Sequence, residues 1–292
     1  MAEWPKDNDN LSVPELVEII GDGNEGHDVR SRAASLELNS RLKRLSTAEL
    51  FQAIFEGEID DAYPWMAIRV LHARATPEVF EAAVACAESD DPCRRIRGFN
   101  VLSQLGIKYG SSENPFRDRC VELAIRGLQD PDSDVVAAAA WVLNHHESEH
   151  GKATLMQLKD HPSEDVRLAV ATAACPDENE TELRVALELM EDSDEDVRDW
   201  ATFALGTQCE LDSPEIRDAL RARLNDPHKD TRNEALWGLV HRRDISAIRT
   251  LLQRLGAEAW VKGDEYAAER ALNITGDVSV EHLCEGLRKL VD

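Results

Sequence analysis

The residues best suited to metal binding in this sequence are three histidines close together in the chain. His145, His146 and His150 lie in the segment NHHESEHGK, and His146 and His150 have the i, i+4 spacing of two metal ligands on a helix. The segment is polar and has no cysteine nearby. We therefore interpret it as a solvated helix end or loop, and we expect neither a metal nor another cofactor.

Runs of carboxylates are the second candidate for chemistry. Asp60-Asp61, Asp90-Asp91 and the run from Glu191 to Asp196 invite an acid–base or calcium interpretation. The calcium loop of an EF-hand needs a glycine within it and a terminal glutamate, and the segment EDSDEDVRDW has no such glycine. Capping of helix starts accounts for these carboxylates. No GxGxxG or GxxxxGK[ST] loop occurs either, so we expect no catalytic residues and no enzyme.

The charge balance indicates which partners the chain would bind. The 292 residues include 33 Lys plus Arg and 57 Asp plus Glu, which gives a net charge of −24. Phosphate binding needs a surplus of cations, so nucleic acid is not an expected partner. A protein with a basic surface is the natural complement. The alternative interpretation is that the acidity serves only solubility.

The cysteines and the apolar segments indicate where the protein works. The six cysteines form no CxxC pair, so we expect reduced packing residues and not a zinc site or disulfide framework. The first residues, MAEWPKDNDN, do not resemble a secretory signal. No window approaches the roughly 18 apolar residues that a membrane span needs. We expect a cytoplasmic protein that does not associate with membranes.

An internal repeat determines how the chain must position these residues. The segment EDSDEDVRDWATFALG, from Glu191, matches KDHPSEDVRLAVATAA, QDPDSDVVAAAAWVLN and NDPHKDTRNEALWGLV position by position. Each copy has a turn with aspartate and then an alanine-rich helix. A small residue in the middle of that helix recurs 31 to 34 residues apart, with one interval of 41. These anchors are Ala33, Ala67, Gly98, Ala139, Val170, Ala201, Ala235 and Ala268.

The residues around each anchor predict a pair of helices per repeat. A leucine usually follows the anchor by four residues, which places both on one helix face, where a neighbouring helix can approach. Prolines such as Pro131 and Pro227 end the preceding helix. Asp134, Asp165, Asp196 and Asp230 are expected to cap the start of the second helix. The segment from 1 to 27 is expected to hold acidic residues and a first helix, and 28–292 to form one continuous domain.

The pattern DPxxDVRxxAxxAL resembles the short HEAT repeat that also occurs in phycobilisome-lyase proteins. The resemblance covers roughly residues 28 to 285 and implies an all-α, right-handed α-solenoid of about eight helical hairpins. It also implies that the second helices line a concave face, and that turn aspartates pair with helix arginines between repeats. The arginine positions are Arg30, Arg95, Arg167, Arg198 and Arg232, and the candidate partners are Asp130, Asp160, Asp192 and Asp226.

Two columns of residues on the second helices point to a binding surface. Two positions after the anchor stand Trp141, Phe203 and Trp237, and one position before it stand Trp200 and Glu234. Aromatic side chains flanked by carboxylates are typical of protein-binding hot spots, although packing between repeats is the alternative for each tryptophan. The first repeats carry arginines in these columns. The predicted binding residues are Trp141, Asp199, Trp200, Phe203, Asn233, Glu234, Trp237 and His241.

The favoured function is therefore a non-enzymatic scaffold, expected to be a monomer, that grips a basic partner protein. The segment from Asp196 to Asp244 also resembles bacterial HEAT-repeat proteins of the YibA type, which are encoded in Rhs loci. That resemblance implies an immunity protein that neutralises a toxin domain. The alternatives are a regulatory or chaperone-like adaptor and, from the resemblance to phycobilisome lyases, a bilin lyase-like protein.

Overall fold

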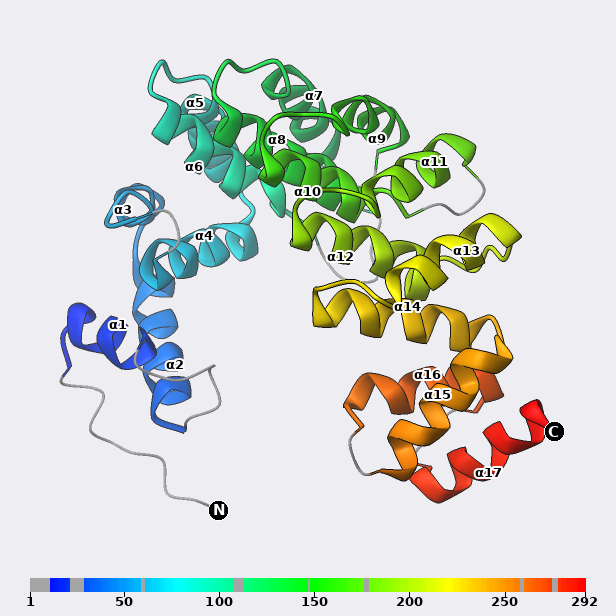
Figure 1. Ribbon diagram of the computed structural model, residues 1–292. Helices are drawn as coiled ribbons and strands as arrows, with labels where there is room; N and C mark the ends of the chain where they lie inside the picture. Colours follow the sequence, from blue (N-terminus) through cyan, green and yellow to red (C-terminus); the bar gives the residue numbers. More distant parts are fainter. Residues whose placement is uncertain are drawn as a thin grey trace. The chain divides into compact units, whose positions relative to one another are not determined.

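The predicted helix pairs are present in a computed structural model, which describes residues 11–21, 29–58, 61–107, 113–146, 148–175, 179–257, 260–274 and 278–292. Within these residues the chain forms helices and no strands (Figure 1). The helices are α1 (Val13–Gly21), α2 (Val29–Arg44), α3 (Thr47–Ala53), α4 (Ala62–Arg74), α5 (Pro77–Ala87), α6 (Pro92–Ser103), α7 (Arg117–Gly127), α8 (Ser133–His146), α9 (Glu149–Leu155), α10 (Glu164–Ala173), α11 (Glu180–Leu189), α12 (Glu195–Phe203), α13 (Pro214–Arg223), α14 (Lys229–His241), α15 (Ile245–Gly256), α16 (Lys262–Leu272) and α17 (Val280–Val291). A 3₁₀ helix, η3 (Met156–Leu158), follows α9, and a π-helix, η4 (Ala204–Gln208), continues α12.

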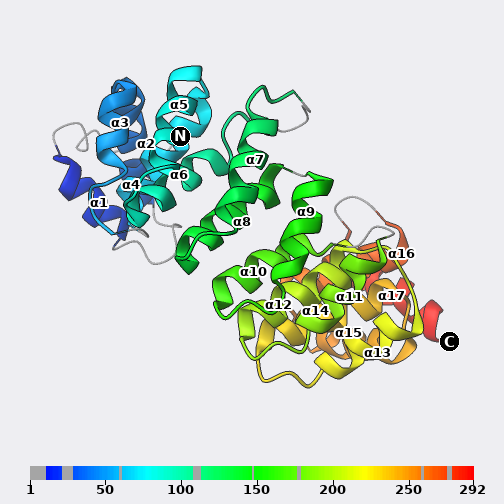
Figure 2. The ribbon, with the colours of Figure 1, turned by 90° about the horizontal axis from the view of Figure 1, so that it is seen from above.

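The chain divides into two compact units, Met1–Gly151 and Lys152–Asp292. In the first unit, α2, α4, α6 and α8 pack one on the next, and in the second unit α10, α12, α14 and α16 do the same. Figure 2 shows α10, α12 and α14 side by side. We call each of these rows a second-helix layer, since its members are the second helices of their pairs. The all-α solenoid of helical hairpins is confirmed, while one continuous domain over 28–292 stays a prediction.

The small anchor residue is buried in the second helix of every pair, as the repeat predicts. Seven of the anchors are at most 1% exposed, and Gly98 is buried as well. A Cβ atom on Gly98 would lie 2.3 Å from the backbone nitrogen of Ala87, so α5 and α6 can approach this closely only at a glycine. The leucines of the repeat are buried too, except Leu272, which is half-buried.

The caps of the second helices lie earlier than the sequence predicts. Asp196 is the second residue of α12, and its amide hydrogen and that of Val197 are accepted by Asp194 Oδ1, each at 3.1 Å. Asp132 caps α8 in the same way, through the amides of Asp134 and Val135. The predicted caps therefore occupy the first helical turn, where their charge still meets the positive end of the helix dipole.

Arginine–aspartate pairs join successive repeats within each unit, as the resemblance implies. In each pair the arginine Nε and Nη2 donate to both oxygens of the carboxylate, at distances between 2.8 and 3.2 Å, and Nη1 donates to two carbonyl oxygens of the preceding turn. The pairs are Arg95–Asp130 in the first unit and Arg167–Asp192 and Arg198–Asp226 in the second. Asp160 instead binds its neighbour Lys159, at 2.8 Å.

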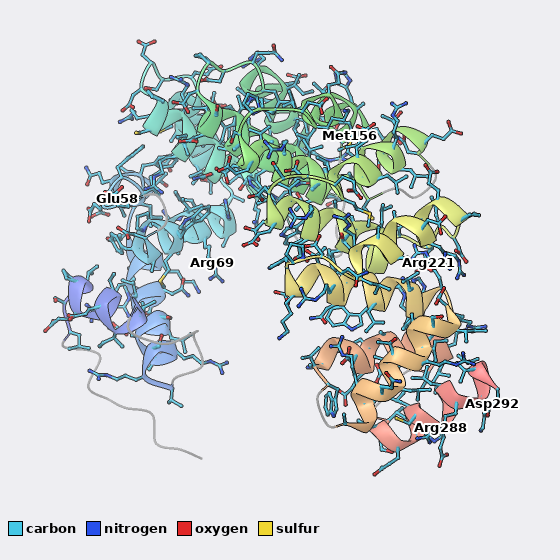
Figure 3. The ribbon with its side chains drawn as sticks, in the orientation of Figure 1. Glu58, Arg69, Met156, Arg221, Arg288 and Asp292 are labelled. Carbon is cyan, nitrogen blue, oxygen red and sulfur yellow. The ribbon has the colours of Figure 1, made fainter. Side chains whose placement is uncertain are left out.

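Charged side chains are spread over the helices of both units, for example Arg69 on α4 and Arg221 on α13 (Figure 3). Of the three arginines that fall in the two columns in the first repeats, Arg32 and Arg69 are exposed. Arg97 is buried and donates to the carbonyl oxygen of Glu58 at 2.9 Å. Arg97 therefore belongs to the interior of the first unit and not to its surface.

Candidate protein-interaction surface

The helices α12 and α14 of the second unit approach each other closely at two glycines. A Cβ atom on Gly238 would lie 2.5 Å from Cα of Gly206, and one on Gly206 would lie 2.8 Å from the carbonyl oxygen of Glu234. Gly206 belongs to η4, where the α12 helix widens into a π-helical turn. Such turns are rare in proteins as a whole, and those that occur are often at functional sites. Here the wide turn places Thr207 against Glu234, with Oγ1 of Thr207 3.4 Å from Oε2 of Glu234.

A cavity of about 210 Å³, which we call the aromatic cavity, lies beside this crossing. Its walls are apolar over most of their area and carry a few convergent polar groups, which is typical of a binding pocket. The lining residues are Phe203 and Thr207 from α12 and η4, Glu234, Trp237 and His241 from α14, and Gly263, Tyr266, Ala267 and Arg270 from α16. The structure thus brings together four of the eight predicted binding residues.

Trp237 is held in place by the helix that follows. Its indole nitrogen donates to Oδ1 of Asp264 at 2.8 Å, and Asp264 has no exposed surface. A Cβ atom on Gly263 would lie 2.1 Å from Cζ2 of Trp237, so the ring rests directly on the backbone of α16. Trp237 is half-buried and forms a fixed wall of the aromatic cavity.

Glu234 is the most strongly perturbed acid of the aromatic cavity. Its pKa is raised to about 8, mainly by burial and then by the nearby carboxylates of Asp199 and Asp230, while the hydrogen bond from the Thr207 hydroxyl lowers it. At neutral pH the carboxyl group is therefore mostly protonated. A titratable group with such a shift, placed in a cavity, is a candidate for function.

Arg270 forms the rim of the aromatic cavity, where its guanidinium binds a carboxylate and a backbone oxygen. Arg270 donates to Oε1 of Glu210 and to the carbonyl oxygen of Thr207. His241 Nε2 lies 3.2 Å from the second oxygen of Glu210. Burial lowers the pKa of His241, and Arg270 lowers it further, so the imidazole is neutral at pH 7. The pKa of Glu210 is lowered by the hydrogen bond from Arg270.

Two exposed aromatic side chains extend the surface beyond the cavity. Tyr266 is 56% exposed, and Trp200 is 42% exposed with its ring centroid 5.5 Å from that of Phe203, in an edge-on arrangement. We call Trp200, Phe203, Trp237 and Tyr266 the aromatic surface. An exposed cluster of large aromatic side chains at a cavity is the kind of surface on which partner proteins dock.

Three further predicted binding residues do not line the aromatic cavity. Asp199 is half-buried and accepts a hydrogen bond from Thr231 Oγ1 at 3.2 Å, and burial raises its pKa. Asn233 is buried and accepts from Nη1 of Arg254 at 3.0 Å, so it supports the packing of α14 on α15. Trp141 belongs to α8 in the first unit, where its ring lies 5.9 Å from that of His145.

Several residues of the site are not among those predicted, and three of them carry a charge or an aromatic ring. Arg270 falls in the column two positions after the anchor, where its charge set it apart from the tryptophans. Tyr266 lies two positions before the anchor Ala268, outside both columns. Glu210 lies in the segment after η4, beyond the repeat pattern. Its aromatic type, one residue before the column that holds Trp200 in an earlier repeat, is the signal in the sequence that could have identified Tyr266.

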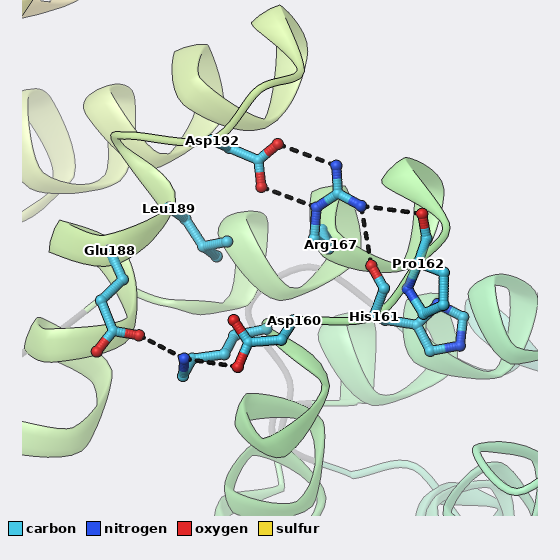
Figure 4. Close-up of a pocket in the computed structure, with 8 residues that line it drawn as sticks. Asp160, His161, Pro162, Arg167, Glu188, Leu189 and Asp192 are labelled. Atoms are coloured by element: carbon cyan, nitrogen blue, oxygen red, sulfur yellow. Dashed lines mark hydrogen bonds and ion pairs between the residues drawn. The ribbon is translucent and has the colours of Figure 1, made fainter.

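A second cavity, of about 350 Å³, lies at the turns of the second unit (Figure 4). The charged groups that line it are paired with one another. Arg167 binds Asp192 and the carbonyl oxygens of His161 and Pro162, and Lys159 binds Asp160 and Glu188. This cavity is a consequence of the arginine–aspartate ladder and offers no free group for chemistry.

The histidines, cysteines and helices of the described residues bear on metal binding, disulfides and membranes. Among them, no three His, Cys, Asp or Glu side chains are placed to hold a metal ion. His146 is buried, and its Nε2 lies 2.9 Å from the carbonyl oxygen of Leu102. The six cysteines form no disulfide with one another, and four of them are buried. None of the described helices has the length and apolar character that crossing a membrane requires.

Comparison with known proteins agrees with this architecture. A family model of HEAT repeats matches residues 183–273, which include α12, α14 and α16. Protein YibA of Escherichia coli strain K12 is 26% identical over 248 residues, which cover 77% of this chain and 81% of YibA.

Solved structures show the same fold. The X-ray structure of E. coli YibA matches 88% of this chain and 96% of its own, with a TM-score of 0.67 and 21% identity. The S. pombe condensin Cnd3–Cnd2 subcomplex matches 90% of this chain and 37% of its own, with a TM-score of 0.57 and 17% identity. Residues 183–273 therefore match HEAT repeats, and the chain is similar to YibA in sequence and in fold.

Proposed function

We propose that this chain is a non-enzymatic scaffold that binds a partner protein on the aromatic surface of its second unit. HEAT-type and armadillo-type solenoids generally serve protein binding, because their stacked helices present long surfaces. The observation that carries the proposal is the exposure of Trp200 and Tyr266 beside a cavity whose other walls are fixed. Rigid aromatic side chains of this kind supply contact area at little conformational cost.

The charge of the chain supports a basic partner. The net charge is −24, and the surroundings of the aromatic surface include Asp199 and Glu210. Acidic groups around an apolar centre steer a basic protein toward the site and disfavour acidic competitors. We propose that the chain acts as a monomer in the cytoplasm.

The sharper form of the proposal is an immunity protein that occludes a toxin domain. A nuclease toxin has a basic surface because it holds nucleic acid, and such a surface would complement the acidity of this chain. The test is co-expression with the product of the neighbouring gene. Rescue of growth supports immunity, whereas binding of several host proteins without rescue supports the alternative of a general adaptor. A spectral change on incubation with bilin would instead support a lyase-like function.

The binding site is tested with variants of the aromatic surface. The partner is captured from an extract of the native host on the immobilised full-length chain, identified, purified and titrated. We expect the Trp200→Ala/Tyr266→Ala variant to bind at least about 30-fold more weakly, since one hot-spot side chain contributes about 2 kcal/mol. Both side chains are exposed, so the helical circular dichroism should not change.

Ile245→Ala is the matched control. Ile245 is 49% exposed, is apolar and lies on α15, outside the second-helix layer. The control should bind the partner as the native chain does. If the partner binds the double variant with unchanged affinity but no longer binds Ile245→Ala, the interface lies on the layer that contains α15 and the proposed site is wrong.

A further inference from the structure

The chemistry of the aromatic cavity indicates what kind of group it would accept. Phe203, Trp237 and Tyr266 line it with aromatic rings, and Glu234 supplies a carboxyl group from the same helix as Trp237. Rings that enclose a space beside an acid form an environment that attracts cations, through the ring quadrupoles and the carboxylate together. An outer cation is already near one of these rings, since Nζ of Lys262 lies 5.6 Å from the ring centre of Tyr266.

We propose that the aromatic cavity receives an arginine side chain of the partner protein, whose guanidinium lies against these rings and pairs with Glu234. The proposal rests on the proposed function and names the chemistry that the partner must carry at this site. Arginine fits better than lysine, because a guanidinium is planar, stacks on aromatic rings and loses less hydration on burial. Arginine is also enriched at the centres of protein interfaces.

Glu234 has no cation of its own among the described ion pairs. The groups that face it are Asp199 from α12, Thr207 from η4 and Asp230 from α14, of which two are acidic. Arg270 of α16 lines the same cavity but is bound to Glu210 and to a backbone oxygen. His241 is neutral, because burial lowers its pKa. The local balance of charge is therefore negative once Glu234 loses its proton.

Binding of arginine would move one proton. In the free chain Glu234 carries a proton at neutral pH, since its pKa is raised to about 8. A guanidinium stays charged throughout this range, so pairing converts the carboxylic acid to a carboxylate and releases the proton to solvent. The affinity for arginine should then rise as the pH rises, by up to about tenfold per pH unit below pH 8, and level off above it.

Tripeptides are the probe for this cavity. The full-length chain, labelled with ¹⁵N-tryptophan, is titrated with acetyl-Gly-Arg-Gly-amide and with the same peptide carrying citrulline or lysine. The indole signal of Trp237, assigned from Trp237→Phe, reports on the cavity itself. We expect the arginine peptide to move this signal and to bind at least tenfold more tightly than either of the other two, with the predicted rise between pH 6 and 8.

Variants separate the cavity from the general acidity of the chain. Glu234→Gln should weaken arginine binding at least tenfold and remove its pH dependence, because glutamine has the same shape and no charge. Glu215→Gln, on the exposed side of α13, should change neither. Equal binding of the citrulline or lysine peptide, or unchanged binding by Glu234→Gln, would overturn the assignment of arginine.

The two proposals fail in different ways. Suppose that the partner no longer binds Trp200→Ala/Tyr266→Ala but the native chain shows no selectivity for the arginine peptide. The aromatic surface is then supported as the interface, and the assignment of arginine to the cavity is wrong. If the arginine peptide binds in the cavity while the double variant binds the partner with unchanged affinity, the arginine site is supported and the proposed interface is wrong.

Discussion

Trp237 of α14 donates its indole hydrogen to Asp264 of α16, a carboxylate that is fully buried. The second oxygen of Asp264 lies 3.0 Å from Nη2 of Arg254 and 3.2 Å from the backbone nitrogen of Val261. A buried charge is tolerated only when its lone pairs are occupied, and these three donors meet that requirement. The same bond therefore fixes the wall of the aromatic cavity and joins the last two helix pairs.

Trp237→Phe tests this link. The phenyl ring keeps most of the apolar contact but leaves Oδ1 of Asp264 without its donor, so we expect the free energy of unfolding to fall by about 1–3 kcal/mol. The measurement is denaturant unfolding followed by circular dichroism. Trp200→Phe is the control, since that side chain is 42% exposed and should be nearly neutral. An equal effect of the two substitutions would mean that the hydrogen bond adds no stability.

Arg198→Met tests the ladder. Although burial alone would raise the pKa of Asp226, the hydrogen bonds from Arg198 and the amide of His228 lower it. Asp226 is 1% exposed, so removing its main cation leaves a buried charge poorly compensated. We expect a loss of about 3–5 kcal/mol in the free energy of unfolding at pH 7. The loss should shrink as the pH falls and Asp226 takes up a proton.

The surface pair Arg119–Glu81 provides the comparison for the ladder. Its side chains are 57% and 61% exposed, so Arg119→Met should cost no more than about 1 kcal/mol in the same unfolding experiment. Both substitutions remove a guanidinium from an ion pair, but only Arg198 is buried and also donates to two backbone carbonyl oxygens. Similar losses would show that burial of the Arg198 pair contributes little.

Arg242→Met tests how much the hydrogen bonds from Arg242 to the backbone around the π-helix stabilise the fold. Arg242 is buried, and burial lowers its pKa. Its guanidinium donates only to backbone oxygens, which belong to Leu205, Gly206, Cys209, Leu211 and Gly238. Since each buried oxygen left unpaired costs about 1–3 kcal/mol, we expect a loss of at least about 3 kcal/mol in stability. Arg243→Met, at an exposed neighbour with one bond to Ala271, should cost far less.

The repeat itself could be predicted from the sequence, because it depends on local spacing. A small residue followed by leucine recurs every 31 to 34 residues, with one longer interval, and marks the helix face that packs against a neighbouring helix. Every anchor is buried, as predicted. The sequence predicts the caps two positions too late, because at α8 and α12 an aspartate stands on each side of the helix start. Asp194 and Asp196 cannot be told apart by residue type alone.

The candidate site was only partly predictable, because it depends on contacts between repeats. Trp200 and Trp237 both stand in the selected columns, but only Trp237 meets Gly263 and Asp264 of the next repeat. Periodicity identifies the column and does not determine the rotamer. The π-helical turn that brings Thr207 to Glu234 departs from the regular helix on which the columns were based.

Glu234→Gln tests the protonation of the aromatic cavity through stability. The pKa of Glu234 is raised from its ordinary value of 4.5 to about 8, so the folded chain holds a proton that the unfolded chain has lost between these values. Folding stability must therefore decrease as the pH rises from about 4.5 to 8, by at most about 1.4 kcal/mol per pH unit, and the loss is complete above pH 8. The glutamine variant lacks this slope.

The measurement is the difference in unfolding free energy between native chain and Glu234→Gln, taken at pH 5 to 9. Subtraction removes the contributions of the other titrating groups that the two proteins share. We expect the variant to gain stability relative to the native chain as the pH rises, and Asp199→Asn to reduce that gain, because Asp199 helps to raise the pKa of Glu234. A difference that stays constant with pH would mean that Glu234 is already ionised in the folded chain at neutral pH.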